Sequence, residues 1–209
     1  MSATRGLYAI YNRAGLDGDR LDAVDAVLAA GAIWLQYRDK RPHAPDRGLM
    51  TELAALTRAH GAKLIINDDW RLAVETGADG VHLGQTDGSV SQARAALGPR
   101  AIVGISCQDR ITRARAGIAA GASYISFGRF FASTTKPDAP PAETRVLTAA
   151  RELGVPVVAI GGIHAGNAPA LIAAGADLIA VSAGLFEAAD PGAAAAELAH
   201  LFAPQPPNR

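Results

Sequence analysis

Cysteine is nearly absent from this sequence, since Cys107 is the only one among 209 residues. A single thiol excludes an intramolecular disulfide framework and fits a reducing compartment. Long apolar runs are also lacking, because none approaches the roughly 18 residues of a membrane-spanning helix. Residues 1–12 show no cationic segment followed by an apolar one, the pattern of a secretory signal. We therefore expect a soluble, cytoplasmic protein without a membrane partner.

An excess of charge of either sign is missing too, because 20 Lys and Arg residues balance 20 Asp and Glu residues. This balance gives no global field that would attract nucleic acid, so any anion site must be local. Aromatic residues make up only 5% of the chain, whereas hydrophobic residues make up 49%. Ala, Val, Ile and Leu dominate the hydrophobic residues, and such small side chains suit helices packed on a parallel sheet. The length allows one domain with a sizeable core.

A repeated Gly-Ala pair organises the chain. It follows a helical pattern and precedes an apolar run at four places: Gly31-Ala32, Gly77-Ala78, Gly121-Ala122 and Gly175-Ala176. We expect each of these glycines to end a helix. The intervals between the pairs are each long enough for two successive βα units, so the repeat predicts eight strands.

The apolar runs place these strands at residues 7–11, 33–37, 63–66, 80–83, 102–106, 124–127, 157–160 and 178–181. Helical patterns separate them, as at residues 21–30 and 50–60. This alternation predicts an α/β protein, a single (β/α)8 TIM-barrel domain over residues 1–209, with 203–209 as a frayed tail. An open doubly wound sheet is the alternative, but it usually has a Gly-rich phosphate-binding turn after its first strand, which residues 11–15 lack.

Polar side chains follow the predicted strands at their carboxyl ends, the edge where parallel barrels bind ligands. Gln36, Arg38 and Lys40 are two residues apart, so they share a face that we expect to point into the barrel mouth. Buried cations need a partner, and these therefore predict an anionic ligand. Internal salt bridges to Asp68 or Asp87 are the alternative.

Asp68 and Asp87 end the third and fourth predicted strands, and neighbouring strands lie ~4.8 Å apart. Two carboxylates that close repel each other unless a proton or a cation lies between them. Beside Arg38 and Lys40, such oxygen ligands favour Mg²⁺ that bridges to phosphate oxygens. Asp68 could instead cap the next helix, although Asp69 is also placed to do so. Other polar residues complete a predicted cradle for a metal diphosphate: Asn67, Ser106 and Lys136.

A second anion site is predicted after the seventh and eighth strands. Gly161-Gly162 and Ser182-Ala183-Gly184 would present backbone N–H groups where many barrels hold a phosphate monoester. Packing alone is the other explanation for these small residues. Between the two sites, residues 129–141 form a loop rich in Ser, Thr and Pro, which we expect to act as a lid.

A set of motifs resembles the thiamine phosphate synthase family, in the same order over nearly the whole chain. The motifs are Gln-Tyr-Arg-Asp-Lys at 36–40, Ile-Asn-Asp-Asp at 66–69, Gly-Val-His-Leu-Gly-Gln-Thr-Asp at 80–87, Gly-Ile-Ser at 104–106, Ser-Thr-Thr-Lys at 133–136, Ala-Ile-Gly-Gly-Ile at 159–163 and Val-Ser at 181–182. The resemblance implies a transferase of thiamine biosynthesis. It would condense a (diphosphooxymethyl)pyrimidine that carries an amino and a methyl group with hydroxyethylthiazole phosphate or its carboxylated form. The diphosphate leaves, the thiazole nitrogen attacks, and thiamine phosphate forms.

The resemblance also implies the site. Mg²⁺ is the implied cofactor, with Asp68 and Asp87 as its ligands, and the implied catalytic cations are Arg38, Lys40 and Lys136. The implied substrate-binding residues are Gln36, Tyr37, Arg38, Asp39, Lys40, Asn67, Ser106, Ser133, Thr134, Thr135, Lys136, Gly162, Val181 and Ser182. Of these, Gln36 contacts the pyrimidine, and the thiazole phosphate rests on Ser133, Thr135, Gly162 and Ser182. The chain has Ser133 where the family commonly has Thr, and Tyr37 and Asp39 where Leu and Glu are usual, without losing a needed hydroxyl or cation.

The expected partners are the two small-molecule substrates, and the chain could form a homo-oligomer. A ring-nitrogen nucleophile has a free lone pair, so the reaction needs a stabilised leaving group and no general base. His82 either makes its hydrogen bonds inside the barrel or touches the pyrimidine. Two rival functions are a thiazole tautomerase on a related barrel, which needs an acid/base residue but no diphosphate cradle, and a non-enzymatic sensor of phosphate ligands.

Overall fold

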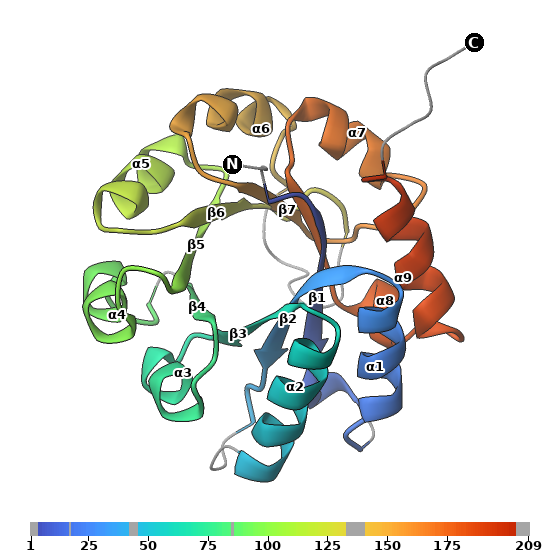
Figure 1. Ribbon diagram of the computed structural model, residues 1–209. Helices are drawn as coiled ribbons and strands as arrows, with labels where there is room; N and C mark the ends of the chain where they lie inside the picture. The colour runs from blue at the N-terminus through green and yellow to red at the C-terminus, as the bar shows by residue number, and fades with distance from the viewer. Residues whose placement is uncertain (1–3, 17, 42–45, 85, 133–140, 204–209) are drawn as a thin grey trace.

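The computed structural model describes residues 4–16, 18–41, 46–84, 86–132 and 141–203. Eight parallel strands close into a barrel in the order of the sequence (Figure 1). They are β1 Gly6–Asn12, β2 Ala32–Arg38, β3 Lys63–Asn67, β4 Gly80–Leu83, β5 Ile102–Gln108, β6 Tyr124–Phe127, β7 Val157–Ile160 and β8 Leu178–Val181. The predicted TIM barrel is confirmed, and β4, β6, β7 and β8 have the predicted bounds. Pairing of β1 with β8 closes the sheet and rules out the open doubly wound alternative.

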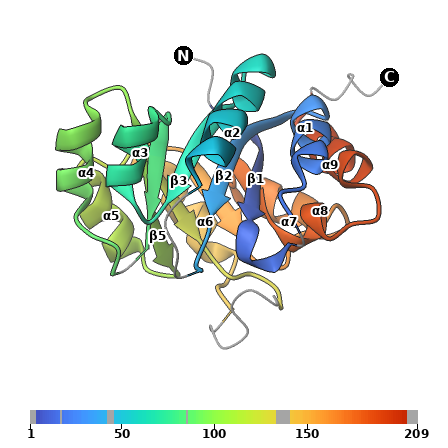
Figure 2. The ribbon, with the colours of Figure 1, turned by 90° about the horizontal axis from the view of Figure 1, so that it is seen from below.

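Helices surround the barrel, as the view at right angles shows (Figure 2). They are α1 Leu21–Ala29, α2 Arg47–Ala59, α3 Trp70–Thr76, α4 Val90–Leu97, α5 Ile111–Ala119, α6 Arg145–Ala150, α7 Ala168–Ala174, α8 Ala183–Phe186 and α9 Pro191–His200, with short 3-10 turns η1 Arg13–Gly15 and η2 Arg151–Leu153. In α2 the helix begins earlier than the predicted residue 50, because the Asp46 side chain accepts a hydrogen bond from Leu49 N and caps it. No helix in the described part of the chain is both long and apolar enough to cross a membrane.

The repeated Gly-Ala pairs end helices, as predicted. Gly77 and Gly175 are the C-cap residues of α3 and α7, while Gly31 and Gly121 come one residue after the caps of α1 and α5. All four have positive φ, from 64° to 121°. Glycine adopts this backbone conformation without the strain that a Cβ would bring, so each pair stops a helix and starts the turn into the next strand.

Strand alternation divides the core into two layers. The inner layer fills the barrel and comprises Tyr8, Ile10, Trp34, Ile65, Tyr124, Val158, Leu178 and Ala180. The outer layer packs the strands against the helices, and Leu35, Leu53 and Ile66 are among its members. Inside the barrel, the Trp34 ring lies 5.2 Å from that of Tyr8 and 5.0 Å from that of Tyr124. The barrel is therefore a packed core, and a ligand can bind only at one of its ends.

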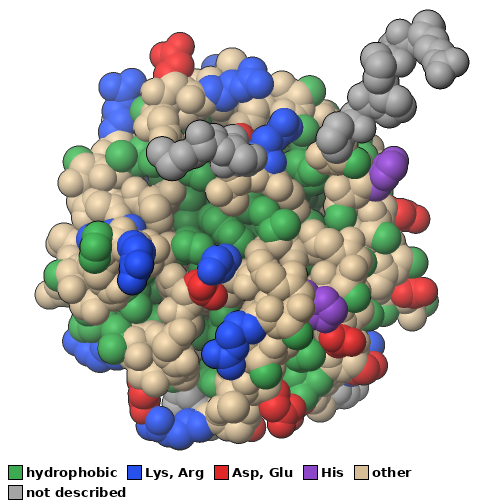
Figure 3. Space-filling model, viewed as in Figure 1, with side chains coloured by type: hydrophobic (Ala, Val, Ile, Leu, Met, Phe, Trp, Pro, Cys, Tyr) green, Lys and Arg blue, Asp and Glu red, His purple; other side chains and the backbone are tan. Residues whose placement is uncertain are grey.

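The two ends of the barrel differ in polarity. Figure 3 views the end where the strands begin, and hydrophobic side chains gather at the centre of that face. At the opposite end, the strands run out into the polar residues 36–40, 67–69 and 106. The polar residues that could bind a ligand are thus concentrated at the carboxyl edge of the barrel, as in other barrels of this architecture.

Gly80 permits close contact between β4 and β5. A Cβ at this position would lie 1.9 Å from the carbonyl oxygen of Ile102, its partner in the strand register. Because β4 and β5 are paired within a closed barrel, the two strands cannot move apart without a large cost in free energy. We expect Gly80→Ala to lower the free energy of unfolding by about 3 kcal/mol, measured by chemical denaturation.

Gly48→Ala is the matched control. Gly48 lies in α2, where the atom nearest to an added Cβ is Asp46 Oδ1, at 3.3 Å. There we expect a change of less than about 1 kcal/mol, since alanine is also the better helix former. Equal effects of the two substitutions would contradict the close packing at Gly80.

Candidate active site

The carboxyl half of β2 presents a polar face to the barrel mouth. Gln36 is 3% exposed and its Nε2 donates a hydrogen bond to Tyr8 OH at 2.7 Å, which places it on the inner face. Two residues further, Arg38 Nη1 donates to Asn12 Oδ1 at 2.7 Å, at the end of β1. Lys40 follows with an ion pair to Asp68. The predicted common face of Gln36, Arg38 and Lys40 is therefore present.

Tyr37 and Asp39 lie on the other face of the same segment. Tyr37 is 4% exposed within the outer layer, and its OH donates to Asp39 Oδ2 at 3.2 Å. Asp39 also accepts from Arg41 Nη2 at 2.6 Å, and this contact is the main reason that its pKa is lowered to about 2. Burial is the main reason that the pKa of Tyr37 is raised. This placement favours a packing role for both side chains, and their contact with a substrate stays a prediction.

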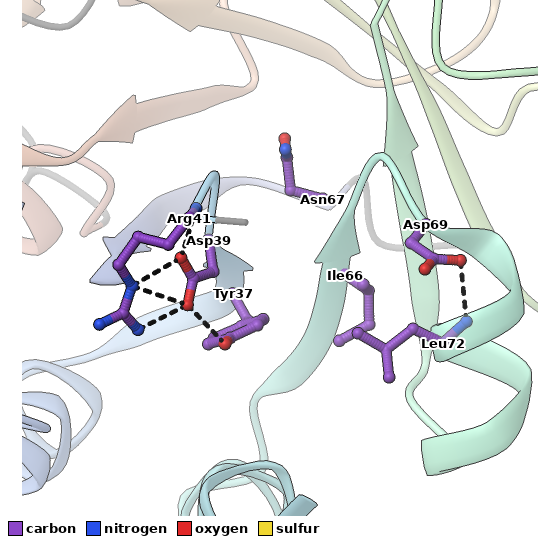
Figure 4. A pocket seen from close by; sticks show the side chains of 7 residues that line it. All are labelled: Tyr37, Asp39, Arg41, Ile66, Asn67, Asp69 and Leu72. Atoms are coloured by element: carbon purple, nitrogen blue, oxygen red, sulfur yellow. Dashed lines mark hydrogen bonds and ion pairs between the residues drawn. The ribbon is translucent and has the colours of Figure 1, made fainter. Parts of the chain in front are cut away.

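A polar pocket of about 220 Å³ lies beside these two residues, on the outer side of β2 and β3 (Figure 4). It is lined by Tyr37, Asp39, Arg41, Ile66, Asn67, Asp69 and Leu72. In the close-up, the Asn67 side chain points away from the other six. This fits its position two residues after Ile65 of the inner layer. Asn67 thus lies at the border of the pocket, with its side chain on the inner face of β3.

Asp68 and Asp87 lie side by side at the ends of β3 and β4. Burial and the contact with the Asp87 carboxyl raise the pKa of Asp68, while Lys40 acts in the opposite direction. Asn67 Nδ2 donates to Asp68 Oδ2 at 2.6 Å, and Gly84 N donates to Asp87 Oδ2 at 2.9 Å. The two carboxyl groups are thus oriented by neighbours on the same two loops.

The donor set fits a magnesium ion. The position that a Cβ on Gly84 would occupy is 2.2 Å from Asp87 Oδ2 and 3.8 Å from Asp68 Oδ1, so the bare backbone of Gly84 allows the Asp87 carboxyl group to lie against it, close to Asp68. Within the described ranges, no group of three or more His, Cys, Asp and Glu side chains is gathered for a metal. Two carboxylates suffice for Mg²⁺, which keeps several waters and takes the rest of its oxygen ligands from phosphates. Sequence reasoning did not single out Gly84.

Both alternatives raised for these aspartates can be decided. Asp69, not Asp68, is the N-cap of α3, since its side chain accepts hydrogen bonds from Arg71 N and Leu72 N. Asp68 instead has a left-handed backbone, with φ of 67°, at the turn after β3. The alternative of an internal salt bridge holds for Lys40 and Asp68. For Arg38, the partner is the amide of Asn12 rather than a carboxylate.

Ser106 lies on β5 between two residues of the outer layer, Ile105 and Cys107, so its side chain is on the inner face. Cys107 is buried, and burial raises the pKa of its thiol to about 12. A thiol of this kind stays protonated and is a poor nucleophile. Ser106 therefore faces the mouth, while Cys107 belongs to the packing.

The turns after β7 and β8 lie next to each other. A Cβ on Gly184 would be 3.1 Å from Val181 Cγ1 and 3.2 Å from the carbonyl oxygen of Ile163, which follows Gly162. Ser182 is the residue before α8, and Val181 packs in the outer layer. The predicted neighbours Gly162 and Ser182 are thus on adjacent loops.

The glycines after β7 also serve packing. The segment after β6 runs beside them, with Phe131 N donating to Gly161 O at 3.0 Å. A Cβ on Gly161 would lie 2.3 Å from Arg129 Cβ, and one on Gly162 would lie 2.2 Å from the carbonyl oxygen of Ala132. Close backbone contact therefore requires glycine at both positions, as the packing alternative stated, and phosphate binding there stays a prediction.

Some predicted residues lie outside the described part of the chain, and their roles stay predictions: Ser133, Thr134, Thr135 and Lys136. Most of the predicted lid, residues 129–141, belongs to the same gap. The predicted tail beyond Ala203 also lies outside the described residues.

A buried polar chain inside the barrel is the feature that sequence reasoning missed. His82 Nδ1 lies 2.8 Å from Tyr124 OH, and Tyr124 OH lies 2.9 Å from Tyr8 OH. Tyr8 OH in turn accepts the hydrogen bond from Gln36 Nε2. His82 therefore has a partner inside the barrel, as the first of its two alternatives stated. The available signal was the inward position of tyrosines in otherwise apolar strands.

A closed (β/α)8 barrel with paired carboxylates and cations at its carboxyl edge belongs to the class of barrel enzymes that act on small molecules. The family profile described as thiamine monophosphate synthase matches residues 7–185. The thiamine-phosphate synthase of Chromobacterium violaceum is 54% identical over 199 residues, 94% of this chain and 96% of that protein. That of Thiobacillus denitrificans is 51% identical over 204 residues, 96% of each chain.

A solved structure agrees. The thiamine phosphate pyrophosphorylase from Pyrococcus furiosus superposes with a TM-score of 0.83 at 30% identity, covering 95% of each chain. The chain belongs to the thiamine monophosphate synthase family. Its function is accordingly the transferase reaction of thiamine biosynthesis that forms thiamine phosphate, and nothing in these comparisons favours the tautomerase or the sensor.

Proposed function

We propose that this chain uses Mg²⁺ to join an aminopyrimidine diphosphate to a thiazole phosphate at the carboxyl edge of the barrel. The observation that carries the proposal is the pair Asp68 and Asp87, whose adjacent carboxyl groups share the mouth with Arg38 and Lys40. Two carboxylates beside two cations form a site for a metal ion and a polyanion together.

Asp68 and Asp87 would hold the metal ion, and Mg²⁺, when bound, neutralises charge on the leaving diphosphate. Asn67 orients Asp68 through its hydrogen bond to Oδ2. Arg38 and Lys40 stand beside these groups, and we assign them to the diphosphate oxygens together with Ser106 and Lys136. Cations that are already in place lower the barrier to bond cleavage without reorganisation at the moment of reaction.

The thiazole nitrogen attacks the methylene carbon as the diphosphate departs. The C–N bond forms from the nitrogen lone pair, the C–O bond breaks, and its electrons leave with the diphosphate. No proton has to be removed before attack, so no general base is assigned. We place the thiazole phosphate at Gly162 and Ser182 on the adjacent turns after β7 and β8, with Ser133, Thr134 and Thr135 as further contacts. Val181 precedes Ser182, and because its side chain packs in the outer layer we assign only its backbone to the lining of the site.

Gly162→Ala tests the thiazole phosphate side. Gly162 has φ of 63°, and a Cβ there would approach the carbonyl oxygen of Ala132 to 2.2 Å. The turn must shift, so its N–H groups move away from the phosphate. Because the loss of one or two such hydrogen bonds corresponds to about 1.5–3 kcal/mol, we expect the KM for the thiazole phosphate to rise at least about tenfold. The KM for the pyrimidine diphosphate should change less than about twofold.

The control for backbone strain is Gly154→Ala. Gly154 has a similar φ of 75°, but no atom lies within 4 Å of an added Cβ. This variant should lose some stability and keep both KM values. A Gly162→Ala variant that raises both KM values equally would contradict the two-sided layout.

The reaction itself is tested by incubating the purified chain with both substrates, with and without Mg²⁺, and measuring thiamine phosphate and diphosphate. We expect equal amounts of both products with Mg²⁺, and neither when EDTA or the omission of one substrate blocks the reaction. Product formation at an unchanged rate in EDTA would contradict the metal dependence.

The remaining features of the proposal concern the whole chain. We propose a cytoplasmic enzyme made of one domain over residues 1–209, with small molecules rather than nucleic acid as partners. Size-exclusion chromatography with light scattering would show whether it forms a homo-oligomer.

A further inference from the structure

The polar chain inside the barrel joins residues from four strands. Tyr8 of β1 and Tyr124 of β6 are 1% and 0% exposed, and their hydroxyl oxygens lie 2.9 Å apart. At one end of the chain, Gln36 of β2 donates from Nε2 to Tyr8 OH at 2.7 Å. At the other end, His82 Nδ1 of β4 lies 2.8 Å from Tyr124 OH. None of the three residues beyond Gln36 has a role in the reaction proposed above.

The fold makes room for this chain at Gly104. A Cβ on Gly104, the register partner of Tyr124, would lie 2.0 Å from Tyr124 Cζ and 2.4 Å from its hydroxyl oxygen. The tyrosine ring therefore crosses the bare backbone of β5 and stacks against the His82 ring, with centroids 5.5 Å apart and planes 25° from parallel. Both tyrosines are held by packing on every side, so their hydroxyl groups have fixed positions.

The directions of the hydrogen bonds follow from proton counting. Each tyrosine hydroxyl has one proton, and burial raises the pKa of both tyrosines, so both are neutral. Gln36 donates to Tyr8, so Tyr8 must send its own proton to Tyr124, and Tyr124 must send its proton to His82 Nδ1. With Gln36 donating to Tyr8, any other assignment leaves a fully buried O–H without an acceptor; the reversed chain requires both a turned amide and a proton on His82 Nδ1.

We propose that Tyr8 and Tyr124 are positioning residues that fix the orientation of the Gln36 amide and thereby set the specificity of the site for an amino rather than an oxo substituent on the pyrimidine. The inference rests on the proposed function, in which Gln36 contacts the pyrimidine. Within the described chain Gln36 makes no other side-chain hydrogen bond, and its atoms are not among the buried ones that lack a partner. Its Oε1 and second N–H are therefore available to a ligand in the mouth.

The fixed amide matches one pattern of donors and acceptors. An aminopyrimidine presents an N–H donor on the exocyclic amine next to an acceptor ring nitrogen, and Oε1 with the second Nε2–H complements this pair. The oxo analogue presents an acceptor oxygen next to a ring N–H, which requires the amide turned by 180°. Turning it would place Oε1 against Tyr8, whose proton is committed to Tyr124 as long as His82 Nδ1 is the acceptor at the other end of the chain. Recognition of an amide-like edge by a fixed complementary group discriminates strongly, because the wrong ligand leaves buried polar groups unpaired.

The two tyrosines are predicted to act differently when their hydroxyl groups are removed. Tyr8→Phe removes the partner of Gln36, so neither amide orientation is favoured. Tyr124→Phe removes the acceptor of the Tyr8 proton, which can then be donated to Gln36 Oε1 in the turned amide. This variant therefore favours the orientation that suits the oxo analogue.

The test compares dissociation constants for two ligands, the aminopyrimidine diphosphate and its oxo analogue, with Mg²⁺ and without thiazole phosphate, so that no condensation occurs. We expect the wild-type chain to bind the amino compound about a hundredfold more tightly or better. The preference should fall about tenfold in Tyr8→Phe, and further in Tyr124→Phe, since about 1.4 kcal/mol corresponds to a factor of ten. A merely structural role would weaken both ligands together and leave the ratio unchanged.

Tyr11→Phe is the matched control, because the buried Tyr11 donates its hydroxyl proton to the carbonyl oxygen of Asp19 in the outer layer. It should keep the wild-type ratio. An unchanged ratio in both inner-layer variants overturns the proposal, and if one of them does not fold, the other decides. Formation of thiamine phosphate by the wild-type chain is measured separately: its absence would refute the proposed function and this inference with it, whereas its presence with unchanged ratios would refute the inference alone.

Discussion

Removing either carboxylate of the proposed metal site is expected to lower turnover at least about a thousandfold at saturating substrates, because leaving-group stabilisation is the main catalytic demand of this reaction. We expect this for both Asp68→Ala and Asp87→Ala. The fold should survive, since the two side chains lie on the rim and the loss of one relieves the contact that raises the pKa of Asp68. Steady-state rates over a range of Mg²⁺ concentrations measure the effect, and higher Mg²⁺ should restore part of the activity.

Asp69→Asn is the control for these variants, because Asp69 is next in the chain but serves as the N-cap of α3. Asparagine can also cap a helix, so this variant should keep the turnover and its dependence on Mg²⁺, with stability changed by less than about 1 kcal/mol. Wild-type turnover and metal response in Asp68→Ala or Asp87→Ala would refute the assigned ligands.

The second large effect is expected for Lys136→Ala. Lys136 is assigned to the diphosphate, whose charge grows as the C–O bond breaks, so its ammonium acts more strongly on the transition state than on the bound substrate. We expect kcat to fall about a hundredfold, the usual size of losing one such group, while the KM for the thiazole phosphate changes less than about twofold. Steady-state kinetics with each substrate varied in turn separates these parameters.

Lys63→Ala provides the comparison for Lys136→Ala. Lys63 is the first residue of β3, at the opposite end of the barrel, and its Nζ lies 2.8 Å from Asp79 Oδ1 in an exposed ion pair. Losing it should leave all kinetic parameters unchanged, because the charge lies far from the mouth and is screened by solvent. A similar loss of kcat in both variants would point to a general effect of charge rather than to a contact with the diphosphate.

Local patterns predicted the architecture well. Alternating apolar residues and the repeated Gly-Ala pairs indicate strands and helix ends, and both depend on only a few neighbouring residues. The spacing of Gln36, Arg38 and Lys40 by two also predicts their common face correctly. The same rule sends Tyr37 and Asp39 to the outer layer, whereas the resemblance of the whole motif at 36–40 places all five residues at the substrate.

Contacts across the barrel could not be predicted in this way. Tyr8 and Tyr124 are 116 positions apart, and their contact depends on the closure of the barrel and on the space above Gly104. The contact between Asp68 and Asp87 was predicted because adjacent strands end at the same level, but the close approach of the Asp87 carboxyl group to Gly84 depends on the turn after β4. The exact loop geometry, including the positive φ of Asp68, follows from tertiary packing rather than from local sequence.

The most direct test of the metal–diphosphate cradle is Mn²⁺ binding, followed by electron paramagnetic resonance, in the presence of inorganic diphosphate. Mn²⁺ replaces Mg²⁺ at oxygen sites and its free signal disappears on binding. We predict that the wild-type chain binds Mn²⁺ tightly only when diphosphate is present, and that Asp68→Ala and Asp87→Ala abolish this binding while Asp69→Asn retains it. Binding of equal strength in all four proteins would contradict the account.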